Sequence, residues 1–94
     1  MYVSAATAWE MATKFRLKKL DGASNLIVDF RKELLVAGFL ELDVTVAHGL
    51  LAGRLEDDHK DPFDRMLIAQ AKIEGLTLVS NESVFDRFGV PRIW

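Results

Sequence analysis

The sequence predicts an α/β protein in which a parallel sheet is flanked by helices. Two observations support this fold class: amphipathic helical segments alternate with short apolar segments that resemble strands, and 94 residues suffice for one domain only. No repeat, low-complexity stretch or proline-rich linker interrupts the chain. We therefore expect residues 1–94 to form a single domain.

The composition excludes several classes of protein. Half of the residues are hydrophobic and the formal net charge is −2, which excludes a disordered chain and argues against nucleic-acid binding through bulk positive charge. No apolar run approaches the roughly 18 to 20 residues of a membrane helix, and the N-terminus lacks the layout of a signal peptide. We therefore expect a cytoplasmic protein without membrane contact.

The first half of the chain predicts a strand, two helices and a second strand. Tyr2 and Val3 end a short strand, and residues 4–17 form a helix that Ser4 or Thr7 caps. Its expected buried face consists of Ala5, Ala8, Trp9, Ala12 and Phe15. Residues 25–38 form the second helix, which ends at Gly38 and precedes a strand over 39–44. This helix is expected to bury Leu26, Ile27, Phe30, Leu34 and Leu35.

The second half of the chain contains the clearest helix. Residues 44–55 predict a third helix, and the fourth has Asp61 as its N-cap, Pro62 at its first position and Gly75 after its last turn. Further along the chain, we expect a strand over 76–80, a short helix over 81–88 and an extended segment over 90–94.

Carboxylates are the only plausible reactive groups. The chain has no cysteine, which excludes disulfides, thiolate nucleophiles and cysteine-ligated metals. It also lacks a serine-nucleophile elbow and a glycine-rich phosphate loop. Oxygen atoms and two histidines remain as metal ligands, and oxygen favours hard cations. We expect His48 on a helix surface, and His59 and the acidic run 56–58 in a solvated loop.

Asp64 is the most informative carboxylate. Leu67, Ile68 and Ala71 follow it at helical spacing, so its side chain continues the apolar stripe that faces the interior. The structural alternative is a first-turn acid that interacts with the helix dipole and with the N-cap amide of Asp61. Spacing alone favours the structural alternative slightly and leaves a functional site open.

Glu82 and Glu10 are weaker candidates. Glu82 follows a predicted strand, where parallel sheets place their ligand sites, but a helix N-terminus also favours an acid without any function. Asn81 is the expected cap there, and Ser80 offers a hydroxyl beside the acid. Glu10 lies four residues before Lys14, and an exposed ion pair between them would explain it fully.

The segments VSAATAWEMATK, HKDPFDRMLIAQA, LTLVSNESVFDRFGV and RIW resemble the PIN-domain family, most closely the VapC-type toxins of bacterial toxin–antitoxin pairs. The resemblance covers nearly the whole chain in order and spacing. It implies a ribonuclease that depends on Mg²⁺ or Mn²⁺, with RNA as substrate and an antitoxin as partner.

The resemblance also implies residue roles. Asp64 corresponds to a direct metal ligand, Glu10 to a ligand or a residue that positions metal-bound water, and Glu82 to an acid farther from the ion. Glu82 is the loosest match, because the family more often has aspartate there, and Asp86 is a weaker candidate. Ser80 matches the small hydroxyl before the last acid. The cations nearest to these acids are expected to guide the RNA backbone, and they are Lys14, Arg16 and Arg65.

The chain departs from the family pattern at its start. Such toxins usually begin with a strand that carries an aspartate, and here we expect an N-terminally truncated PIN-like domain without it. This expectation leaves three alternatives: a ribonuclease with weak or no activity, a non-catalytic domain that binds an antitoxin or itself, and a gene start assigned too far downstream. A missing central strand would leave sheet edges exposed, which favours a homodimer or a domain-swapped oligomer.

Overall fold

A computed structural model describes residues 1–18 and 31–93. Its contacts divide the chain into two compact units, Met1–Asp43 and Val44–Trp94. None of the helices in the described ranges combines the length and the apolar content needed to cross a bilayer.

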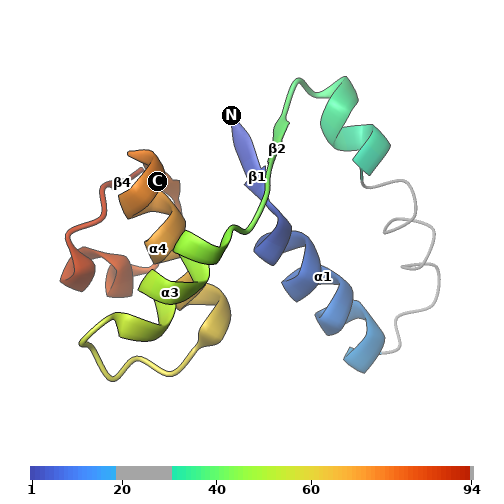
Figure 1. Ribbon diagram of the computed structural model, residues 1–94. Helices are drawn as coiled ribbons and strands as arrows, with labels where there is room; N and C mark the ends of the chain where they lie inside the picture. Colours follow the sequence, from blue (N-terminus) through green and yellow to red (C-terminus); the bar gives the residue numbers. More distant parts are fainter. Residues whose placement is uncertain (19–30, 94) are drawn as a thin grey trace. The chain divides into compact units, whose positions relative to one another are not determined.

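The first unit is a parallel strand pair with a helix that begins directly after the first strand. β1 (Tyr2–Ser4) pairs with β2 (Leu40–Leu42) in parallel, and α1 (Ala5–Lys18) follows β1 without a loop (Figure 1). The Ser4 hydroxyl accepts the Ala6 N–H at 3.0 Å, which confirms Ser4 as a capping residue of this helix. Residues 31–36 are helical, and Gly38 adopts a left-handed φ of 84° soon after them, as its place at the helix end predicts.

The expected burial of three apolar residues in this unit was wrong. Trp9 is 65% exposed, Leu35 is 63% exposed, and Ala5 is exposed as well. Trp9 lies on the predicted face of α1, but this face lines an open cavity of about 450 Å³ instead of a filled core. Leu34 lines the same cavity, whereas Leu35, the next residue of the helix, points elsewhere. The predicted core positions Leu26, Ile27 and Phe30 lie outside the described residues.

The second unit is built around α4 (Pro62–Glu74), whose predicted ends are confirmed. Asp61 caps the helix, because its Oδ1 accepts the N–H groups of Phe63 at 2.9 Å and Asp64 at 3.1 Å. Pro62 occupies the first turn, and Gly75 ends the helix with a φ of 66°. The Asp61 cap and Pro62 set the start of α4 and therefore place Asp64 in its first turn.

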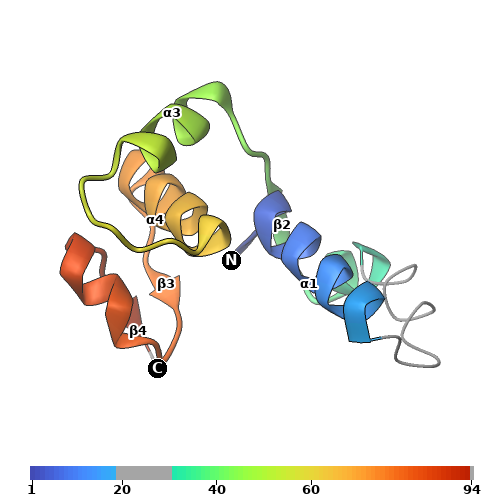
Figure 2. The ribbon, with the colours of Figure 1, turned by 90° about the horizontal axis from the view of Figure 1, so that it is seen from below.

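The other elements of this unit cover α4 and close a small core. α3 (Val46–Arg54) packs on α4, and β3 (Leu78–Val79) pairs in parallel with β4 (Arg92–Ile93) (Figure 2). The segment η1 (Ser83–Phe88) is a 3₁₀-helix between these strands. The core consists of Ile68, Ala71, Phe85, Phe88 and Val90. Parallel pairing and flanking helices agree with the predicted α/β class, although both strands are shorter than expected.

His48 is a buried core residue, so its predicted position on a helix surface was wrong. Its side chain is fully buried, and its Nδ1 accepts the Thr45 N–H at 3.0 Å while the Thr45 hydroxyl accepts the His48 N–H at 3.2 Å. Nε2 then carries the proton and donates to Glu74 Oε1 at 2.9 Å. The capping box and this bond to α4 satisfy both ring nitrogens, which allows burial of the imidazole.

Candidate functional site

Asp64 lies in the first turn of α4, where its carboxylate is bonded to a histidine. The side chain is 16% exposed, and its Oδ2 lies 2.9 Å from Nε2 of His59. An ionised carboxylate only accepts hydrogen bonds, so the histidine Nε2–H is the donor. The carboxylate therefore turns toward His59, whereas the structural alternative had it return to the N-cap amide of Asp61.

His59 was expected to be a solvated loop residue, and this expectation was wrong. Its side chain is 22% exposed, and its ring makes an edge contact with Phe88, with 6.4 Å between the centroids. The histidine lies five residues before Asp64, in the loop that leads to the N-cap. The spacing from His59 to Asp64 in the motif HKDPFD is the only signal in the sequence that could have indicated this pair.

Arg65 fixes the loop that carries His59. Its guanidinium donates four hydrogen bonds, all to backbone carbonyl oxygens at 2.7 to 3.0 Å. The acceptors are Ala52, Leu55, Asp57 and His59. Four of the five guanidinium N–H groups are therefore engaged within the protein. Sequence reasoning placed Arg65 on the RNA, and it did not anticipate this structural function.

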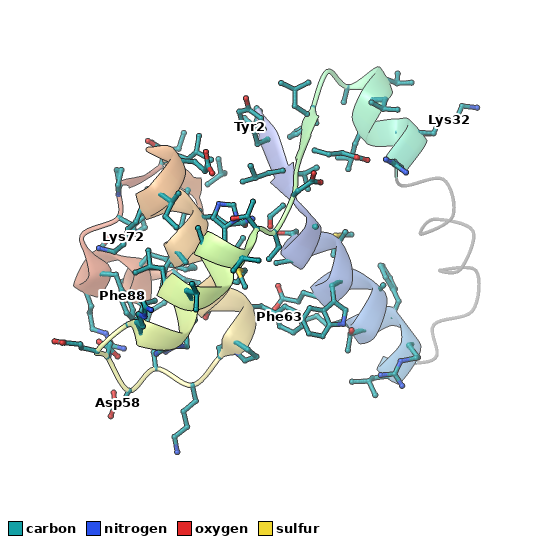
Figure 3. All side chains as sticks on the ribbon, viewed as in Figure 1. Tyr2, Lys32, Asp58, Phe63, Lys72 and Phe88 are labelled. Atoms are coloured by element: carbon teal, nitrogen blue, oxygen red, sulfur yellow. The ribbon has the colours of Figure 1, made fainter. Side chains whose placement is uncertain are left out.

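Asp57 provides a second anchor for the same loop. Its Oδ1 accepts the backbone N–H of His59 and an N–H of Arg87, each at 2.9 Å. Asp57 is thus partly buried and hydrogen-bonded, whereas the acidic run 56–58 was expected to lie in a solvated loop. Asp58, the next residue, is exposed and projects away from the helices (Figure 3). The loop is consequently held on both sides of His59.

Glu82 follows β3 as predicted, and Ser80 lies directly after the strand, which was expected to include it. The Glu82 N–H donates to the Ser80 hydroxyl at 3.1 Å, and the Glu82 side chain is exposed. Glu82 itself is the N-cap residue of η1 and makes no side-chain cap bond, so the predicted cap, Asn81, was wrong. The 3₁₀-helix begins at Ser83, which places the cap position at Glu82 instead of Asn81.

Asp86, the weaker alternative acid, is paired with a cation. Its two carboxylate oxygens accept hydrogen bonds from Nε and Nη2 of Arg92 at 2.8 and 3.0 Å. These hydrogen bonds lower the pKa of Asp86 below its ordinary value of 3.8. Arg92 also donates to the Ser80 carbonyl at 3.3 Å. Asp86 therefore links η1 to β4.

Glu10, in the first unit, forms the predicted ion pair within α1. Its Oε2 lies 3.4 Å from Nζ of Lys14, whose side chain is 64% exposed. Arg16 is also exposed. The Glu10 side chain is 23% exposed, and an i, i+4 ion pair of this kind stabilises a helix by only a few tenths of a kcal/mol.

The donor chemistry of this chain suits a hard cation at Asp64. Within residues 1–18 and 31–93, no three His, Cys, Asp or Glu side chains are grouped as a metal site. Mg²⁺ usually binds through one or two carboxylates and retains several waters, so a single well-held carboxylate is compatible with it. The partly buried Asp64 carboxylate fits that description.

Comparison with known families identifies the class of protein. The model of the PIN domain matches residues 1–91, nearly the full length of the chain. The chain therefore belongs to the PIN domain family, whose members are generally nucleases that depend on divalent metal ions. Comparison with curated proteins and with solved structures gave no match of significance.

Proposed function

We propose that this PIN domain is a metal-dependent endoribonuclease that acts as the toxin of a bacterial toxin–antitoxin pair. The observation that carries the proposal is the Asp64 carboxylate, partly buried in the first turn of α4 and oriented by His59. Purely structural first-turn acids need no such partner, because the helix N-terminus itself stabilises them. Family membership and the motif DPFDR support the same function.

Two acids of the second unit have distinct roles in the proposed reaction. Asp64 binds Mg²⁺ or Mn²⁺ directly, and Glu82 acts from farther away. A bound divalent ion supplies a more acidic water and positive charge beside the scissile phosphate. The exposed cations Lys14 and Arg16 contact RNA phosphates, while Arg65 acts mainly on its own loop.

The proposed function predicts that removal of divalent ions abolishes cleavage. Purified protein incubated with a mixed RNA pool and Mg²⁺ is expected to produce internal cuts, which excess EDTA stops and excess Mg²⁺ restores. Gel electrophoresis and end mapping of the fragments provide the measurement. Cleavage that persists in EDTA, or its absence with both Mg²⁺ and Mn²⁺, would contradict the proposal.

We also propose that the toxin forms a homodimer. Among the described residues, each sheet has only two strands, and edge strands readily pair with another chain. Tyr2 and Leu40 are partners across β1 and β2, and each is at least half exposed, so apolar surface accompanies these edges. Light scattering is expected to give about twice the 10.6 kDa mass of one chain. The mass of a single chain at all concentrations would contradict a homodimer.

A further inference from the structure

We propose that His59 is a positioning residue for Asp64. Its Nε2–H holds Oδ2 of the carboxylate, so that the carboxylate presents its other oxygen to a divalent cation in a fixed orientation. This inference rests on the proposed function, because it assigns a task to His59 within the same site.

The hydrogen bond between the two side chains has the geometry of a strong, charge-assisted interaction. The distance between the nitrogen and the oxygen is 2.9 Å, and both side chains are mostly shielded from water. The terminal torsion of an aspartate is broad, so a carboxylate without a partner samples many orientations. Partners of this kind orient metal-binding carboxylates, and their loss typically weakens metal affinity or activity by about 10- to 100-fold.

His59 is itself fixed by three different contacts. Its backbone N–H donates to Asp57, and its carbonyl oxygen accepts Nη1 of Arg65 at 3.0 Å. Its ring meets the ring of Phe88 edge-on at an interplanar angle of 69°. The backbone and the ring plane are both constrained, so the Nε2–H direction is set before any ion binds. This preorganisation distinguishes a positioning residue from a loop histidine that meets an acid by chance.

Two substitutions separate the hydrogen bond from the ring contact. His59→Phe keeps an aromatic ring beside Phe88 but removes the donor, whereas His59→Gln supplies an amide N–H at a similar reach. Titration with Mn²⁺, followed by electron paramagnetic resonance, is expected to show about 10- to 100-fold weaker binding for H59F and largely restored binding for H59Q. The kcat for RNA cleavage is expected to follow the same order, with little change in KM.

Nitrogen NMR of the metal-free wild-type protein gives a readout independent of activity. At neutral pH we expect a proton on Nε2 of His59 and a clear shift of this resonance in the Asp64→Asn variant. Mn²⁺ affinity of H59F equal to that of the wild type, or an Nε2 without a proton, would overturn the inference. If Asp64→Asn abolishes cleavage and H59F leaves it intact, only the role of His59 fails. If Asp64→Asn still cleaves RNA, the proposed function fails.

Discussion

Replacement of Asp64 by asparagine is expected to reduce RNA cleavage by at least about 100-fold, because it removes the charge of the proposed metal-binding carboxylate. The amide is nearly isosteric with the carboxylate, and Asp64 keeps its backbone bond to the N-cap Asp61, so the helix should remain folded. Initial rates on the mixed RNA pool measure this effect. Induced expression of the wild type, and not of D64N, should also arrest bacterial growth.

The matched control is Asp58→Asn. It makes the same change of charge and shape in the neighbouring loop, at an exposed side chain. Cleavage by D58N should stay within about twofold of the wild type, since exposed charges contribute little. Equal cleavage by D64N and the wild type would show that Asp64 is only a helix-terminal acid.

Replacement of Arg65 by methionine is expected to lower the free energy of unfolding by about 3 kcal/mol. The loss is large because four carbonyl oxygens lose a charged donor at once, and hydration of the loop compensates only in part. Urea denaturation followed by circular dichroism measures the change. Cleavage should fall as well, because the loop no longer fixes His59.

Arg54→Met is the control for this second prediction. Arg54 lies in the last turn of α3 and is exposed, so its loss should change the free energy of unfolding by no more than about 0.5 kcal/mol. Hydrogen exchange should show faster exchange of the His59 backbone amide in R65M only. If R65M is as stable as R54M, the four hydrogen bonds do not hold the loop.

The sequence was most informative where the determining residues are adjacent in the chain. Asp61 fixes the start of α4 through its side-chain cap, and Pro62 and Gly75 act through their backbone preferences, so both ends were predicted correctly. Parallel pairing followed from the alternation of helices and strands. The exposure of Trp9 could not be predicted from the pattern of α1 alone, because it depends on whether other segments fill the space against this helix.

The candidate site was predictable only in part for a related physical reason. Asp64 could be selected as a candidate from its helix face and from the family motif. The positions of the two histidines could not be predicted, because their partners depend on the tertiary fold. His48 bonds to Glu74, and His59 lies in a loop that Arg65 holds. Local patterns select Asp64 as the candidate acid, and the tertiary fold determines which groups bond to its carboxylate.

The most direct measurement is the anomalous scattering of manganese in crystals of the wild-type protein soaked in Mn²⁺. We expect an anomalous peak about 2 Å from the Asp64 carboxylate, with His59 still bonded to its other oxygen. A protein that cleaves RNA while its manganese lies away from Asp64 would contradict the account.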